Sequence, residues 1–136
     1  MIGGRFAWQT GEVKTAFDNA KHKRDIQFLG FIEETALPKL MGSSFAFVYI
    51  SFFEGFGLPL LEAMNMDCPV ICSDTSCFSE VTNNAAAMFD PNNIENIIHE
   101  IEDVVYDEQK FSDLIIKGRN NIKNFSWQKC AEQTLK

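Results

Sequence analysis

The sequence has no surplus of positive charge. Its 12 Lys and Arg residues stand against 19 Asp and Glu residues, which gives a net charge of -7. Nucleic acids and anionic membrane surfaces attract proteins through a basic face. The only basic cluster is KHKR at residues 21–24, which Asp25 follows at once and which is typical of a solvated helix end. We therefore exclude nucleic acid and anionic membranes as main partners.

Long apolar runs are also missing. A membrane-spanning helix needs roughly 18 or more consecutive apolar residues, and no such run occurs in the sequence. The opening residues, MIGGRFAW, lack the arrangement of a signal peptide. We therefore expect no direct membrane insertion and a cytoplasmic location, or a peripheral one at the inner membrane face within a longer enzyme.

The four cysteines do not form a CxxC pair, and neither histidine lies near them in the sequence. Structural zinc sites require closely spaced Cys and His ligands. We expect no metal site, and reduced thiols as in other cytosolic proteins. Cys72 lies in an apolar run, where cysteine usually behaves as a small buried hydrophobe.

What the chain does have is an alternation of apolar runs with helical patterns. Its 136 residues, 46% of them hydrophobic, are enough for one domain with a real core. Strands are expected at residues 26–30, 45–50, 69–72 and 86–89, with the tail of another at MIGG, and helices at residues 10–21, 33–41, 59–65 and 77–81. Strands that alternate with helices predict a Rossmann-like α/β fold, a mainly parallel sheet with helices on both faces. FAFVYI at 45–50 and PVIC at 69–72 are continuously apolar, which predicts burial on both faces.

The last third of the sequence predicts helices only. A regular apolar stripe covers residues 94–105, a second helix is expected at 108–124, and Ser126 is placed to cap a third. No linker or internal repeat divides the chain. We therefore predict a single domain, 1–136, with a helical carboxyl terminus.

The stretch EGFGLPLLEAM, residues 54–64, follows the predicted strand at 45–50. In parallel sheets, ligands bind beyond the carboxyl ends of the strands. Gly55 and Gly57 would let the backbone turn tightly and approach a ligand. Exposed amides at the start of the next helix suit a phosphate, and carboxylates at Glu54 and Glu62 would accept hydrogen bonds from vicinal hydroxyls. Such an arrangement suits a nucleotide-sugar.

A structural interpretation competes with this one. A glutamate in the first helical turn is favourable through the helix dipole alone, by about 0.3–1 kcal/mol. Glu62 would then be a surface residue, and GFG would be a strand-to-helix turn whose apolar neighbours form core. Taken alone, two glutamates at this spacing favour that simpler interpretation.

The full string resembles the signature of the family 4 retaining glycosyltransferases, which have the GT-B fold. The family pattern is written EGFGLPLLEAMACG.PV, and this chain reads EGFGLPLLEAMNMDCPV. Similar family segments match IQFLGFIEETALPKLMGSS upstream, VICSDTSCFSEVTNNAAAMFDPNN downstream and FSWQKCAEQTL near the end. The resemblance covers nearly all of the chain.

The resemblance implies a role for each matching residue. Glu54 would contact hydroxyls of the donor sugar and is our candidate catalytic residue, although we favour positioning over a covalent nucleophile. Glu62 would hold the ribose hydroxyls. Gly55, Phe56, Gly57 and Leu58 would meet the sugar and diphosphate through backbone amides. Gly30 and Phe31 would line the base.

Three departures from the family pattern occur. Asn65, Met66 and Asp67 replace small residues and a glycine, so this turn is expected to differ in shape. Ser79 stands where a proline is common, and Leu40-Met41 replaces a pair that contains an aromatic residue. None of these changes removes a ligand-contacting group.

Two family features have no counterpart in the sequence: the N-terminal acceptor domain, and an early Arg and Lys that neutralise the diphosphate. We therefore expect a fragment of a longer enzyme that lacks the first strand region of its donor domain. Such a fragment alone is expected to be inactive.

The resemblance implies transfer of a sugar from a nucleoside-diphosphate sugar to a glycan or lipid-linked acceptor hydroxyl with retention of configuration. It implies no cofactor and no obligate metal, in keeping with the lack of a DxD-type pair. Polysaccharide or glycoconjugate synthesis at the cell surface is the expected context. Three alternatives stay open: a glycogen- or sucrose-synthase-like GT-B enzyme, a non-catalytic nucleotide-binding or scaffold module, and a purely structural domain that binds no nucleotide.

Overall fold

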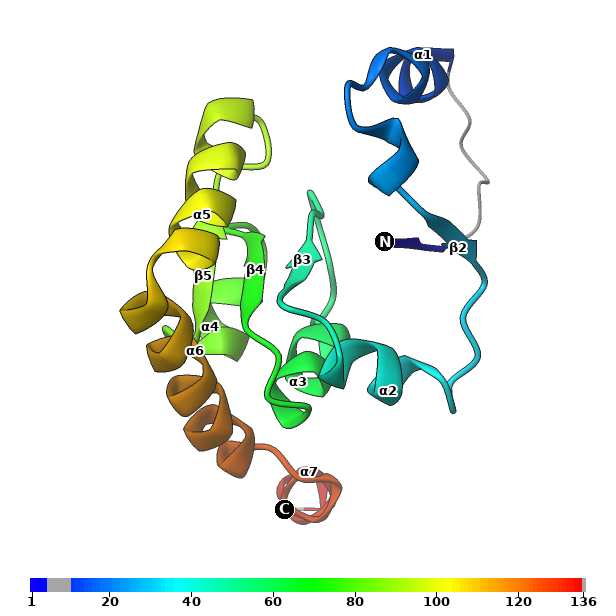
Figure 1. The fold of residues 1–136 in the computed structure, drawn as a ribbon. Helices are drawn as coiled ribbons and strands as arrows, with labels where there is room; N and C mark the ends of the chain where they lie inside the picture. The colour runs from blue at the N-terminus through cyan, green and yellow to red at the C-terminus, as the bar shows by residue number, and fades with distance from the viewer. Residues whose placement is uncertain (5–10, 136) are drawn as a thin grey trace. The chain divides into compact units, whose positions relative to one another are not determined.

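The computed structural model describes residues 1–4 and 11–135, which form two compact units, Met1–Leu37 and Pro38–Lys136 (Figure 1). The first residue of the helix predicted at 10–21 lies outside the described residues. That 1–136 acts as a single donor-binding domain stays a prediction.

The first unit contains a two-stranded parallel sheet. Strand β1 (Ile2–Gly3) pairs with β2 (Phe28–Gly30), and helix α1 (Gly11–Asn19) and the short 3-10 helix η1 (Lys23–Asp25) lie between them in sequence. The ring of Phe17 on α1 packs edge-on against Phe28, with centroids 5.1 Å apart. The described residues of this unit are all exposed or half-buried.

The second unit is built on a three-stranded parallel sheet in the order β3-β4-β5. The strands are β3 (Phe47–Tyr49), β4 (Val70–Ser73) and β5 (Ala86–Phe89). Helix α2 (Leu37–Gly42) precedes β3 in sequence. Helix α3 (Leu58–Asn65) connects β3 to β4, and α4 (Phe78–Thr82) connects β4 to β5. The predicted parallel α/β class is confirmed.

Three further helices follow the sheet: α5 (Ile94–Tyr106), α6 (Glu108–Asn121), which continues into η2 (Ile122–Asn124), and α7 (Trp127–Thr134). Each α-helix has a side-chain cap. Asn93 accepts from the Asn96 amide, Asp107 from two amides of α6, and Ser126 from the Lys129 amide, as predicted for Ser126. None of the described helices is long and apolar enough to span a bilayer.

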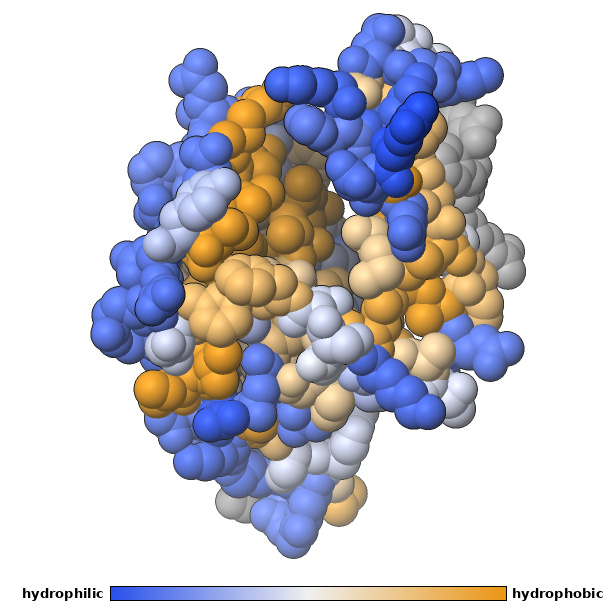
Figure 2. All heavy atoms as spheres, in the orientation of Figure 1, coloured by the Kyte–Doolittle hydropathy of each residue, from blue (hydrophilic) through white to orange (hydrophobic). Residues whose placement is uncertain are grey.

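One part of the core lies between the sheet and the helices α5 and α6, which Figure 1 shows running along the same side of β5. A cluster of buried residues fills it: Ile71, Ala87, Phe89, Val104 and Leu114. Figure 2 shows hydrophobic residues gathered along one side of α5 and hydrophilic ones on its outer side. Of the apolar stripe predicted at 94–105, Ile97, Ile101 and Val104 pack into the core, whereas Ile94, Ile98 and Val105 stay exposed.

Two expectations about single elements need correction. The helix predicted to start at Glu33 begins at Leu37, which places Pro38 in its first turn, where a missing N–H does no harm. The run at 45–50 is not buried on both faces, since Phe45, Val48 and Ile50 are exposed. The reason is that β3 is an edge strand of its sheet, whereas β4, the central strand, is fully buried as predicted.

Candidate functional site

The loop that carries Glu54 leaves the carboxyl end of β3 and is tied to the carboxyl end of β4. The Ser51 amide donates to the Ser73 hydroxyl at 3.0 Å, and the Thr75 hydroxyl donates to the Ser51 carbonyl at 2.9 Å. Ser73 is fully buried, so this anchor is shielded from water. The loop therefore starts from a fixed point at the edge of the sheet where parallel-sheet proteins bind ligands.

Glu54 itself is held at two atoms. Its carboxylate Oε1 accepts hydrogen bonds from the Tyr49 hydroxyl at 3.0 Å and the Ser51 hydroxyl at 3.1 Å. Its carbonyl accepts from the Ser76 hydroxyl at 2.6 Å and from the Cys77 thiol at 3.5 Å. Backbone and carboxylate are thus both fixed, while the residue stays only half-buried.

The state of Tyr49 fits its role as a donor. Burial raises its pKa above the ordinary value, and the hydrogen bond to Glu54 and the negative charge of Glu54 raise it further. An ordinary tyrosine titrates near pH 10. Tyr49 therefore stays protonated at neutral pH, and its hydroxyl donates a hydrogen bond to Glu54.

The two glycines of the GFG bend differ. Gly57 is buried, has φ of +93°, and caps α3. A Cβ added there would lie 2.8 Å from Cε1 of the buried Phe78. Gly55 does not have a positive φ, and a Cβ there would meet open space. The tight bend expected at these glycines thus requires glycine at Gly57 and not at Gly55, and their approach to a ligand stays a prediction.

The start of α3 offers few backbone donors. Pro59 has no N–H, and the Leu60 amide donates to the Gly57 carbonyl at 3.0 Å. Within the described part of the chain, the amides of Gly57 and Leu58 donate to no partner. These two amides are the ones that an anionic ligand could use at this helix end.

Four further residues of the predicted site are Glu62, Phe56, Gly30 and Phe31. Glu62 is exposed on α3, and no contact joins it to Glu54 among the described residues. Phe56 packs its ring edge-on against Phe125, with centroids 6.0 Å apart. Gly30, with φ of +66°, and the exposed Phe31 belong to the first unit. Their ligand roles, like that of Glu62, stay predictions.

Sequence analysis did not identify Tyr49, Ser51, Ser76 or Cys77 as partners of Glu54. One signal was present for Tyr49: it is the single side chain with a hydroxyl inside an otherwise apolar strand, two residues before the loop. A buried tyrosine hydroxyl usually finds a hydrogen-bond partner. Ser76 and Cys77 belong to the segment that follows β4, and residue spacing in the sequence does not show that they contact Glu54.

The turn after α3 shows what the departure from the family pattern does. Asp67, where the resemblance has glycine, adopts φ of +57°. Asp is among the few residues that tolerate this conformation. Its carboxylate forms two hydrogen bonds with Arg119 of α6, at 2.5 and 2.8 Å, and these bonds hold the pKa of Asp67 below its usual range.

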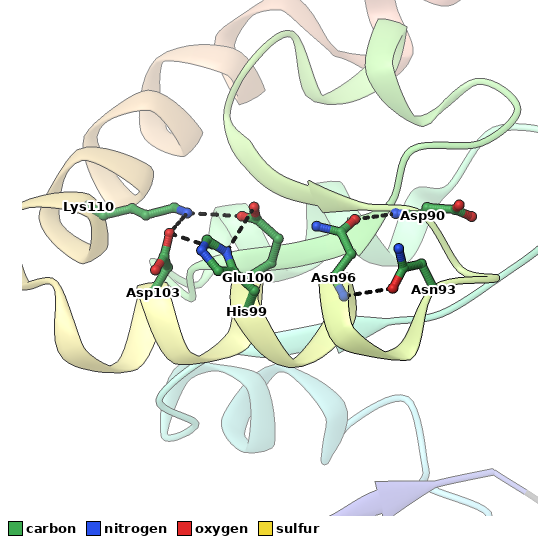
Figure 3. A network of polar contacts seen from close by, with 7 residues as sticks. All are labelled: Asp90, Asn93, Asn96, His99, Glu100, Asp103 and Lys110. Carbon is green, nitrogen blue, oxygen red and sulfur yellow. Dashed lines mark hydrogen bonds and ion pairs between the residues drawn. The ribbon is translucent and has the colours of Figure 1, made fainter.

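A second polar cluster lies on α5 (Figure 3). His99, Glu100 and Asp103 offer ligand atoms close enough together to hold a metal ion. Lys110 already contacts the carboxylates of Glu100 and Asp103 at 2.9 and 3.1 Å. Burial lowers the pKa of Lys110, but its bonds to these carboxylates and their charges raise it on balance, so it stays charged. We interpret the cluster as an ion-pair network that joins α5 to α6.

Fold and loop together define a class: a Rossmann-like α/β protein with an anchored acidic loop at the carboxyl edge of a parallel sheet. Comparison with known proteins identifies the family within this class. The sequence profile of the family described as "Glycosyl transferases group 1" matches residues 9–121. The chain belongs to this family of glycosyltransferases, whose fold is GT-B.

Relatives agree with this assignment. The chain is 33% identical over 135 residues to O-antigen chain mannosyltransferase B of Escherichia coli, covering 99% of this chain and 35% of the relative. Two solved structures share the fold. Sucrose-phosphate synthase from Thermosynechococcus elongatus has a TM-score of 0.78 at 21% identity, over 91% of this chain and 32% of that one. A glycosyltransferase from Rickettsia africae has a TM-score of 0.76 at 24% identity, over 98% and 37%. The chain thus spans about a third of the length of these proteins.

Proposed function

We propose that this chain supplies the donor-binding part of a retaining glycosyltransferase. The enzyme would transfer a sugar from a nucleoside-diphosphate sugar to an acceptor hydroxyl in the synthesis of cell-surface polysaccharide or glycoconjugate. The observation that carries the proposal is the Glu54 carboxylate, held through Oε1 by Tyr49 and Ser51 at the carboxyl edge of the sheet. Family membership supports sugar transfer, and the O-antigen relative supports the polysaccharide context.

In this proposal each of the candidate residues has a separate task. Glu54 accepts hydrogen bonds from hydroxyls of the donor sugar and so fixes its orientation. The amides of Gly57 and Leu58 face the diphosphate, and Glu62 binds the ribose. Phe56 lies along the same segment, and Gly30 and Phe31 contribute to the base contact.

We propose the following reaction for this arrangement. The acceptor hydroxyl attacks the anomeric carbon as the bond from that carbon to the diphosphate oxygen breaks, and the hydroxyl proton leaves with the diphosphate. Negative charge grows on the diphosphate, and preorganised amides at the start of α3 stabilise it. Glu54 acts by positioning rather than as a nucleophile. The proposed geometry needs neither a cofactor nor a metal ligand from this loop.

The first experiment is a binding panel on the protein that contains this chain. UDP-, GDP- and ADP-linked hexoses, mannose included because of the O-antigen relative, are titrated by calorimetry. We expect one base and sugar to bind more tightly than the rest. Binding by none of them would contradict the proposal.

The second experiment tests catalysis. With the preferred donor and a glycan acceptor, the Glu54→Ala variant should lower turnover sharply, by about a hundredfold or more, because orientation of the reacting groups is lost. Glu102→Ala, at an exposed position of α5, is the matched control and should behave as wild type. Near-wild-type turnover by Glu54→Ala would refute the role of Glu54. Nucleotide binding with no transfer by the wild type would favour a non-catalytic module, and NMR of the product would test retention.

A further inference from the structure

Tyr49 is not part of the family signature around Glu54, yet it makes the shortest side-chain contact to that carboxylate. Its hydroxyl donates to Oε1 at 3.0 Å, and Ser51 donates to the same oxygen at 3.1 Å. Within the described part of the chain, no hydrogen bond ends on Oε2. One carboxylate oxygen is thus occupied by the protein, and the other is left to accept hydrogen bonds from a ligand.

The tyrosine ring is itself fixed. It stacks on Phe47 with centroids 5.7 Å apart and a 22° angle, and it contacts Phe78 at 5.8 Å. Phe78 is fully buried and is the same ring that lies against Gly57. The carboxylate of Glu54 and the bend at Gly57 therefore share one aromatic support. A side chain held in this way loses little freedom when it orients a neighbouring group.

We propose that Tyr49 is a positioning residue that directs the Glu54 carboxylate, so that Oε1 stays bound to the protein and Oε2 meets the hydroxyls of the donor sugar. This role rests on the function proposed above. The role concerns only one part of the donor. Tyr49 affects the contact between Glu54 and the sugar and leaves the contact to the nucleoside diphosphate unchanged. The raised pKa of Tyr49 supports this role, since the phenol stays protonated and can therefore donate a hydrogen bond to Glu54.

The test compares two ligands and two tyrosines. Tyr49→Phe removes the hydroxyl and keeps the ring packing. Tyr106→Phe removes the hydroxyl of the only other tyrosine, which is 81% exposed at the end of α5, and serves as the matched control. We expect Tyr49→Phe to bind the sugar nucleotide about fivefold to tenfold more weakly, which corresponds to the net contribution of a typical hydrogen bond. Its affinity for the free nucleoside diphosphate should equal that of the wild type, and Tyr106→Phe should change neither.

A double-mutant cycle adds a second readout. In a Glu54→Ala background, Tyr49→Phe should have no further effect on sugar-nucleotide binding, because the group that it orients is gone. Additive losses would overturn the positioning role. An equal loss of both ligands in Tyr49→Phe would also overturn it and would show that the hydroxyl only supports the fold.

A third readout needs no ligand. In protein with ¹³Cζ-labelled tyrosine, the Tyr49 signal is assigned by its loss in Tyr49→Phe, and its titration is followed by NMR. We expect its pKa to fall towards the ordinary value in Glu54→Ala, whereas an unchanged titration would overturn the pairing. If the wild type binds no sugar nucleotide, the proposed function fails and the positioning role with it. If the wild type binds and Tyr49→Phe binds equally well, the positioning role alone fails.

Discussion

The two units of the chain differ in what holds them together. Every buried core residue among those described lies in the second unit, from Met41 onward. The described residues of the first unit include a two-stranded sheet and the Phe17–Phe28 ring contact, and none of them is buried. The Glu54 loop is anchored in the second unit. Gly30 and Phe31, the proposed base contacts, lie in the first. The loop that holds Glu54 is therefore built on the unit that contains the described core residues.

The largest expected effect tests this difference directly. Ile71→Ala empties space in the core of the second unit, and we expect it to lower the free energy of unfolding by about 2–5 kcal/mol. Leu29→Ala changes a partly exposed residue of β2 and should cost less than about 1 kcal/mol. Urea denaturation of both variants measures the contrast, and equal losses would contradict it.

Glycine substitutions give a second contrast between the two units. Gly57→Ala combines a positive φ with a clash against Phe78 and should destabilise the protein by about 2–3 kcal/mol. Gly30→Ala in the first unit has a positive φ but open space, so about 1 kcal/mol is expected. Gly55→Ala is the control and should stay within about 0.5 kcal/mol. If Gly55 proves as sensitive as Gly57, the assignment of the bend is wrong.

Alkaline pH tests how well the core is shielded. Burial raises the pKa of Cys68 to about 11 and that of Cys72 to about 12. Unfolded thiols ionise near pH 8.5, so the stability that these protonated thiols contribute is present below that pH and is lost as pH rises towards 11–12. We expect a falling midpoint of thermal unfolding above pH 9. In the native protein at pH 8, a thiol reagent should modify the exposed Cys130 and leave Cys68 and Cys72 unmodified, and rapid reaction of all four thiols would contradict the burial.

The smallest effect concerns the surface pair of Asp67 and Arg119. Because the pKa of Asp67 is lowered, its contribution to stability is present above the ordinary carboxyl pKa and is lost as pH falls through the lowered value. Arg119→Ala should therefore lower the unfolding midpoint slightly at pH 6 and not at pH 2. The same difference at both pH values would show that the charge pair is not its cause.

The sequence predicted the fold class because strand and helix periods alternate clearly, and it predicted β4 well because PVIC lies in the middle of the sheet. It misjudged β3, since an apolar strand at an edge and one at the centre have the same local pattern. Leu37 as a helix start depends on the geometry that Pro38 imposes, which hydrophobic periodicity does not show.

Some residues of the candidate site could likewise be identified from the sequence, and others could not. Glu54 and Gly57 could be identified because their motif is local. The donors to Glu54 from Ser76 and Cys77 are separated from it by a whole strand and helix, and only the fold brings them together. The contribution of Tyr49 required knowing that its hydroxyl and the Glu54 carboxylate meet across the turn after β3.

We propose that Glu54 holds the sugar of a nucleotide-sugar donor. The most direct measurement is a calorimetric titration of wild type and Glu54→Ala with the preferred sugar nucleotide and with the free nucleoside diphosphate. We predict that Glu54→Ala binds the sugar nucleotide at least about tenfold more weakly and the nucleoside diphosphate as well as the wild type does. Equal affinity of both proteins for the sugar nucleotide would contradict the claim.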